Sequence, residues 1–204
     1  MMKRVPLTLV CASVAAAVLA GCASPEPRYY TLAQGPGAMA APAPAAAPST
    51  DTLWLEVAPV RVPERLNRPQ LVVRDGGNGS DASLRLLDLS RWSAPLPDEL
   101  RDALSQRLQA TLGAVDTYQQ GLSDVQPLYR ITTEVLRLDA DLGQRAGATI
   151  NWTVRRLPDG KVVSGSTQAE LPAPGAVEGV VTAYREIVAS TARDIAAGVQ
   201  SLRR

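Results

Sequence analysis

The strongest constraint on the fold is a pair of alternating segments joined by a turn. From Ala146 to Val154 every second residue is apolar, with polar residues such as Thr149 and Thr153 between them. A period of two places one set of side chains on a core and the other toward solvent. Residues 157–160 favour a tight turn, because their Pro fixes φ and their Gly accepts positive φ. Since a second alternation runs from Val163 to Leu171, we expect a β-hairpin here.

Other short segments upstream also have strand character. Residues 75–80 are rich in glycine and predict a turn between two of them. In the last strand before the hairpin the apolar phase shifts from Val135 to Leu136, which predicts a β-bulge. The four segments are Leu53–Ala58, Gln70–Arg74, Leu84–Leu89 and Tyr129–Leu138.

Two segments have the period of an amphipathic helix. The first opens at Pro97 with acidic residues that suit the helix dipole, carries leucines four residues apart, and has Gly113 as a stop. The second carries an apolar stripe from Val177 to Val199. Two helices with about six strands predict the α+β class. We expect a two-layer sandwich, with both helices on one face of a mixed, mostly antiparallel sheet.

The N-terminus combines a basic start, Lys3 and Arg4, with an uncharged apolar run over residues 5–20. This order is typical of a secretory signal peptide. The run ends in Leu-Ala-Gly-Cys at residues 19–22, which resembles the lipobox of bacterial lipoproteins. The alternatives are an uncleaved apolar anchor and a secreted protein in which Cys22 is incidental.

The lipobox resemblance implies that residues 1–21 are removed and that Cys22 carries a diacylglycerol thioether and an N-acyl chain. Ala23 follows the cysteine where an Asp would imply retention at the inner membrane, so the resemblance implies a periplasm-facing outer-membrane lipoprotein. Residues 22–50 are expected to form the lipidated segment and a linker, because Ala, Pro and Gly make up 13 of the 16 residues from Gly35 to Thr50. The folded domain is then expected to span residues 51–204.

The composition excludes several classes of function. The chain has no His, and its two cysteines, Cys11 and Cys22, both lie near the N-terminus. The usual zinc sites and the histidine-dependent catalytic units are therefore excluded. With 21 basic and 20 acidic residues the net charge is +1, which argues against nucleic acid as a partner. We expect no enzymatic activity, no metal, and no cofactor apart from the acyl chains on Cys22.

Four segments, in this order along the chain, resemble the PqiC/YmbA-type auxiliary lipoproteins of ABC and MCE transport systems. They are Arg28–Leu32, Val57–Pro63, Leu66–Arg74 and Trp92–Leu96. The resemblance implies a subunit of an MCE-type intermembrane lipid transport system that docks the transporter to the outer membrane and supports membrane integrity. It also implies an MCE protein as partner and a homo-oligomeric ring. The alternative is a periplasmic carrier lipoprotein that itself holds a lipid in an apolar pocket.

The candidate interface residues are Tyr29, Tyr30, Arg68 and Trp92. The tyrosines suit a headgroup boundary or a partner surface, although they also suit a strand packed on the domain. Arg68 could present its guanidinium to a carboxylate or a phosphate, or make an internal hydrogen bond beside Pro69. Trp92 could meet a ligand, although helix–sheet packing is the simpler role for it.

Overall fold

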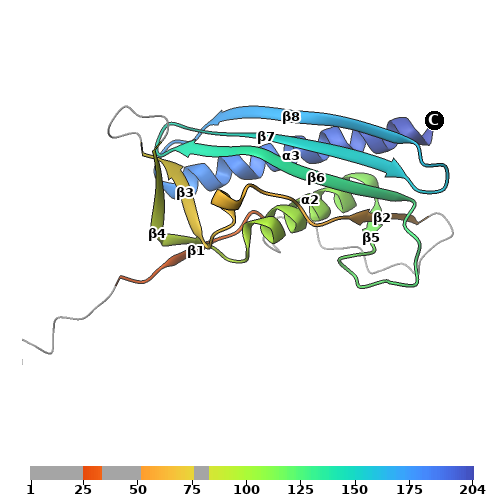
Figure 1. The fold of residues 1–204 in the computed structure, drawn as a ribbon, viewed down its shortest axis with the longest axis horizontal. Coiled ribbons are helices and arrows are strands. Elements are labelled where there is room, and N and C mark those ends of the chain that lie inside the picture. The colour runs from red at the N-terminus through yellow and green to blue at the C-terminus, as the bar shows by residue number, and fades with distance from the viewer. Residues whose placement is uncertain (1–24, 34–51, 76–82) are drawn as a thin grey trace, which may run out of the picture.

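The computed structural model describes residues 25–33, 52–75 and 83–204 (Figure 1). The signal segment, Cys22, the Ala/Pro-rich linker and most of the glycine-rich turn at residues 75–80 lie outside the described residues. The class is α+β, as the sequence predicts, with the strands divided between two mixed sheets rather than gathered into one.

The larger sheet has five strands in the order β5-β2-β6-β7-β8. Its long strands form consecutive antiparallel hairpins, whereas β2 pairs in parallel with both β5 and β6. The strands are β2 (Leu53–Val57), β5 (Ala114–Asp116), β6 (Tyr129–Asp141), β7 (Arg145–Arg156) and β8 (Val162–Pro172).

The sequence patterns of the long strands are confirmed. Ile150 of β7 faces Val135 of β6 and Thr167 of β8, so the apolar positions of the three strands share one face. Gly160 has φ +70°, as the turn requires. The register between β6 and β7 shifts between Val135 and Arg137, which confirms the predicted bulge.

The smaller sheet has three strands in the order β1-β4-β3. β3 (Gln70–Arg74) and β4 (Leu84–Trp92) are antiparallel, and β1 (Arg28–Tyr30) joins the end of β4 in parallel. The short 3-10 helix η1 (Glu64–Leu66) leads into β3. β1 and β4 lie at the end of the molecule opposite the C-terminus (Figure 1).

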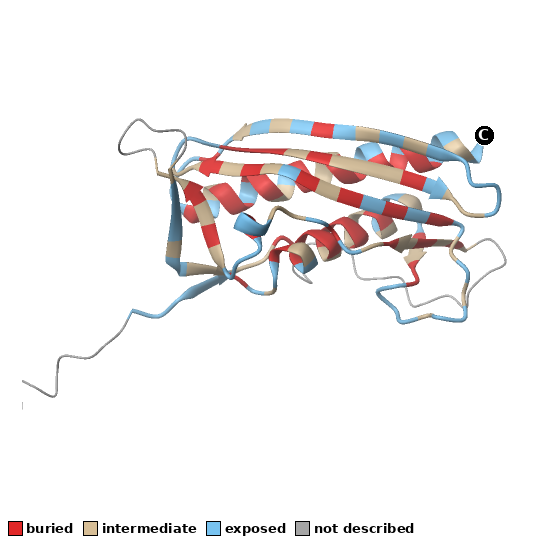
Figure 2. Ribbon diagram, in the orientation of Figure 1, coloured by how far each residue is buried: buried red, intermediate tan, exposed pale blue. Residues whose placement is uncertain are grey.

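The two helices form the second layer. α3 (Val177–Arg203) packs on β7 and β8, and α2 (Leu96–Leu112) packs on β2 and β5 and against α3. Gly113 ends α2 with φ +60°, as predicted for the stop. Figure 2 shows that buried residues are frequent along α2, α3, β6 and β7, the elements of the two layers. The predicted packing of both helices on one face of a sheet is therefore confirmed for the five-stranded sheet.

Trp152 on β7 shows how closely this layer packs. A Cβ atom at Gly165 would lie 2.4 Å from the indole ring, and one at Gly198 of α3 would lie 3.1 Å from it. The ring therefore occupies space that glycine leaves free on both β8 and α3, which is a packing role.

In the part of the chain that the structure describes, neither helix is apolar enough over a sufficient length to cross a bilayer.

Candidate functional site

The N-terminal segment of the described chain is joined to the domain as a strand. Arg28, Tyr29 and Tyr30 pair with residues 90–92 of β4, and the N–H of Ser93 donates to the carbonyl of Tyr30 at 2.8 Å. Leu32 follows and is fully buried in the core. We call residues 28–33 and the side chains that hold them the N-terminal junction.

Glu99, in the first turn of α2, is the centre of this junction. Its carboxylate accepts from the backbone N–H of Leu32 at 2.7 Å and from the hydroxyl of Thr31 at 2.8 Å. Its other oxygen accepts from the hydroxyl of Ser93. Glu99 is 4% exposed, so this carboxylate is buried with several donors instead of facing water. The carboxylate thus fixes the chain just beyond β1 to the start of a helix.

α3 holds the same segment from the other side. Arg185 donates from Nε and Nη2 to the carbonyl of Thr31, at 3.0 and 2.7 Å. Glu178 accepts from the Tyr30 hydroxyl at 3.1 Å and lies 3.4 Å from Nη1 of Arg28. The pKa of the Glu178 carboxyl is lowered, first by a hydrogen bond from its own backbone N–H and then by the Tyr30 hydroxyl.

The structure brings the four candidate interface residues to one end of the molecule. Tyr30 pairs with Trp92, and Tyr29 pairs with the neighbouring Arg91. Trp92 is buried against Tyr184 with ring centroids 6.5 Å apart. The backbone N–H of Trp92 donates to the carbonyl of Pro69, the residue after Arg68. Trp92 therefore packs in the core, whereas Tyr29 and Arg68 are exposed and Tyr30 is partly buried.

A second feature of this end is a set of apolar side chains that the fold leaves in contact with solvent. Their exposed fractions are 62% for Tyr29, 43% for Leu84, 42% for Leu86 and 45% for Leu89. On the opposite side of the same sheet Leu71 and Val73 are almost completely buried. We call Tyr29, Leu84, Leu86 and Leu89 the apolar strip.

A buried ion pair lies between α2 and β5, away from the junction. Nη2 of Arg101 is 2.7 Å from Asp116, whose carboxylate also accepts from the hydroxyl of Ser105 and the N–H of Val57. The Arg101 guanidinium lies over the ring of Tyr118 at 4.4 Å from its centroid. These groups satisfy one another, as structural buried charges do.

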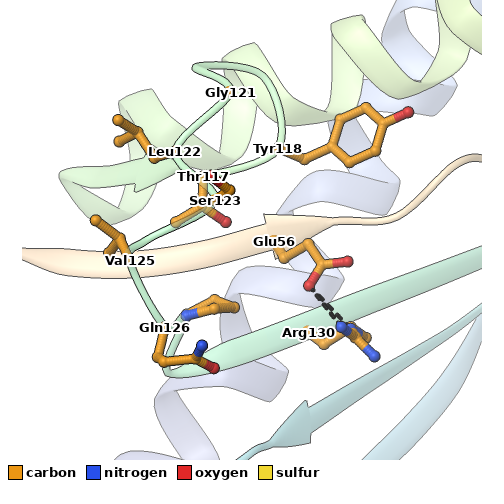
Figure 3. A pocket seen from close by; sticks show the side chains of 10 residues that line it. Glu56, Thr117, Tyr118, Gly121, Leu122, Ser123, Val125, Gln126 and Arg130 are labelled. Atoms are coloured by element: carbon orange, nitrogen blue, oxygen red, sulfur yellow. Dashed lines mark hydrogen bonds and ion pairs between the residues drawn. The ribbon is translucent and has the colours of Figure 1, made fainter.

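Beside this network is an open cavity of about 380 Å³ (Figure 3). Its wall is the loop after β5, and its floor carries Glu56 and Arg130, which pair at 2.9 Å. The two charges on the floor compensate each other. Within residues 25–33, 52–75 and 83–204, no three His, Cys, Asp or Glu side chains gather as metal ligands.

Sequence reasoning missed the two residues that hold the N-terminal segment. Glu99 is one of the acidic residues that the sequence pattern assigns to the helix dipole, and no pattern marks Arg185. Their partners lie 67 and 154 positions away, so no local pattern connects them. The one sequence signal for this attachment was the tyrosine pair, because Thr31 and Leu32, which Glu99 and Arg185 bind, follow it directly.

The sequence matches the model of a family described as the ABC-type transport auxiliary lipoprotein component, over residues 30–196. The chain belongs to this family. The matched region begins at Tyr30 of the junction and ends in the last turns of α3. The recognition from sequence motifs is therefore confirmed: this is a transporter auxiliary lipoprotein family, with no known cofactor, and it is not a known family of enzymes.

Solved structures of similar fold accompany the family match. The crystal structure of an uncharacterized protein has a TM-score of 0.64 at 18% identity, with 86% of this chain and 99% of that chain covered. A protein from Xanthomonas campestris has a TM-score of 0.55 at 18% identity, with 72% of this chain and 82% of that chain covered. At this identity the likeness concerns the fold. No curated protein matches the sequence significantly.

Proposed function

We propose that this auxiliary lipoprotein is lipidated on Cys22, faces the periplasm from the outer membrane, and docks an MCE-type lipid transport system there. The observation that carries the proposal is the family match over residues 30–196. The lipobox at residues 19–22 and Ala23 after the cysteine support the anchor and its location. The role is positional and not enzymatic: the acyl chains hold one end, and the domain binds the partner subunit or further copies of itself in a ring.

The N-terminal junction suits such a role. Glu99 and Arg185 bind the segment that follows Cys22 directly to α2 and α3. A load applied through the acyl anchor would reach the core through several hydrogen bonds at once. A protein that only needed to be retained at a membrane would not require this connection.

Co-purification tests the partner. The tagged full-length chain would be cross-linked in cells of its own host, extracted in detergent and analysed by mass spectrometry. We expect an MCE protein among the cross-linked products. Recovery of the chain without any MCE protein, under conditions where cross-links between its own copies form, would contradict the docking role.

Fractionation tests the anchor and the membrane. Cys22→Ala should release the protein from membranes, and Ala23→Asp should move it to the inner-membrane fraction. Ser24→Ala is the matched control and should stay with the outer membrane. Membrane retention of the Cys22→Ala protein would contradict the lipid anchor, and an unchanged position of the Ala23→Asp protein would contradict the sorting argument.

A cavity supports the second candidate function, a lipid carrier. It encloses about 390 Å³ between the β3–β4 hairpin and β6, within the range of small-molecule pockets. Leu66, Val72 and Leu138 contribute apolar surface, and Asp139 in the same lining pairs with both Arg74 and Arg137. A lipid with one short chain matches the apolar part of this lining. Native mass spectrometry should find stoichiometric lipid if the protein is a carrier, and Val72→Trp, which fills the space, should remove it.

A further inference from the structure

We propose that the apolar strip of Tyr29, Leu84, Leu86 and Leu89 rests on the phospholipid surface of the membrane that holds the acyl anchor. All four side chains belong to β1 and β4, at one end of the molecule (Figure 1). Three leucines on one short strand are each more than 40% exposed. The inference rests on lipidation of Cys22 and adds which face of the domain meets the bilayer.

Chain length is the first support. Cys22 precedes Arg28 by six residues, and a fully extended chain spans at most about 3.6 Å per residue. The first residue of β1 is therefore at most about 22 Å from the lipidated cysteine, whatever path the intervening residues take. Since β1 is paired with β4, the three-stranded sheet is held near the headgroups.

The position of the Ala/Pro-rich segment strengthens this limit. Residues 34–51 follow the junction in the chain, after Glu99 and Arg185 have bound Thr31 and Leu32. Their length cannot add to the distance between the acyl anchor and the domain. In the chain, this segment connects β1 to β2 and does not separate the lipidated cysteine from the junction.

The chemistry of the strip is the second support. A tyrosine and three leucines suit the boundary between headgroups and acyl chains. Arg91 is the register partner of Tyr29, so its side chain shares the face of the strip. Its guanidinium group can reach phosphates while its aliphatic stem stays on the apolar surface. Arg28 and Arg85 lie on the other face of the sheet, where Arg28 pairs with Glu178 and Arg85 is opposite Val73.

The proposal also orients the domain. The turn at residues 157–160 and the end of α3 lie at the opposite end of the molecule from β4 (Figure 1). The twelve residues of β7 cover roughly 40 Å along this direction. With the strip on the bilayer, the far end projects away from it and is free to meet a partner.

Nitroxide labels on the lipidated full-length chain test this contact. Acylated Cys22 does not react with the label, so Leu86→Cys, Leu89→Cys and Val162→Cys each provide a single site. Val162 is the control because it is 46% exposed and begins β8 at the far end. The proteins would be reconstituted in vesicles of phosphatidylethanolamine and phosphatidylglycerol, with no partner present.

We expect the labels at 86 and 89 to collide more with oxygen than with a water-soluble nickel complex, and the label at 162 to show the reverse. Equal nickel access at 86 and 162 would overturn the proposal. Spin–spin broadening at 86 that grows with protein density would overturn it in favour of a second copy packed on the strip. Labelling of Cys22 in the unsubstituted chain would instead contradict lipidation, which keeps failure of the anchor distinguishable from failure of the contact.

Two spacers provide a matched second test. A Gly/Ser insert of about 20 residues between Ser24 and Pro25 adds a root-mean-square reach of about 25 Å, so oxygen preference at 86 should fall. The same insert between Ala41 and Pro42 should leave it unchanged. If both inserts act alike, the junction does not hold β1 on the domain and the proposal fails.

Discussion

The two sheets of this protein bury their side chains in different ways. In the five-stranded sheet β6 alternates buried and exposed positions along most of its length, and α3 covers the apolar face of β7 and β8. In the three-stranded sheet β4 is exposed at most positions although it contains four leucines. A sheet with one covered face normally alternates, as the larger one does.

This difference in burial distinguishes apolar residues that stabilise the core from apolar residues that the core does not require. Ile150 and Ile131 are fully buried and need no further role. Leu86 and Leu89 are close in size and polarity to these residues, yet they lie at the surface beside the junction. Exposed apolar groups that gather in one place mark a surface that meets a membrane or a partner. The following experiments test the contrast, from the largest effect to the smallest.

The largest effect is expected at the buried ion pair beside the five-stranded sheet. Asp116→Ala removes the buried carboxylate of Arg101 and leaves it only the half-exposed Asp102 as a charged partner, which should lower the free energy of unfolding by up to about 3–5 kcal/mol. Denaturant titration measures the change. Glu134→Ala is the control, because its pair with Arg61 is exposed and should contribute less than about 1 kcal/mol. Equal losses in the two variants would remove the distinction between buried and exposed pairs.

A smaller effect is expected at the junction. Glu99→Ala removes the acceptor of Thr31, Leu32 and Ser93 and should cost about 1–3 kcal/mol. Hydrogen exchange at the Leu32 amide should be faster in the Glu99→Ala protein than in the unsubstituted protein, and the increase should be larger than in β6 or β7. Glu178→Ala serves as the control, because its bonds to Arg28 and Tyr30 are exposed. An unchanged Leu32 amide in the Glu99→Ala protein would contradict the role assigned to this carboxylate.

Alkaline pH should lower the free energy of unfolding through Tyr184, which lies where the two sheets meet. Burial raises the pKa of this phenol above its ordinary value of 10.0. Above pH 10 the unfolded chain releases the proton and the folded chain keeps it, so the free energy of unfolding falls by up to about 1.4 kcal/mol per pH unit. Below pH 10 the Tyr184 phenol is protonated in both states, so it does not make the free energy of unfolding depend on pH. Tyr184→Phe should reduce the alkaline slope.

The smallest effect on stability is expected at the apolar strip. Leu86→Ser or Leu89→Ser should change the free energy of unfolding by less than about 0.5 kcal/mol, because these side chains already face solvent. Leu71→Ala on β3, which empties a fully buried site, should cost about 2–5 kcal/mol. Thermal and denaturant unfolding would compare them. A large loss at Leu86 would mean that the strip belongs to the core after all.

Local patterns were sufficient for the elements with long, regular repeats. The alternation from Ala146 to Val154, the turn at residues 157–160 and the leucine stripe of α2 each depend on neighbours within a few positions. Strand length was harder to predict: β4 continues to Trp92, beyond the expected end at Leu89, since its last residues are ordered by pairing with β1. β5 has only three residues and forms because β2 lies beside it.

The sequence by itself determined the class, the hairpins, both helices and the family, because these follow from periodicity, turn residues and short ordered motifs. The tertiary structure decided how the strands divide into two sheets and where the N-terminal segment is attached. The division depends on pairing between strands that are distant in the chain, such as β2 with β6. The attachment depends on Glu99 and Arg185, which bind backbone groups far away in the chain. Backbone groups are the same in every residue, so a side chain that binds them leaves no mark in the sequence of its partner.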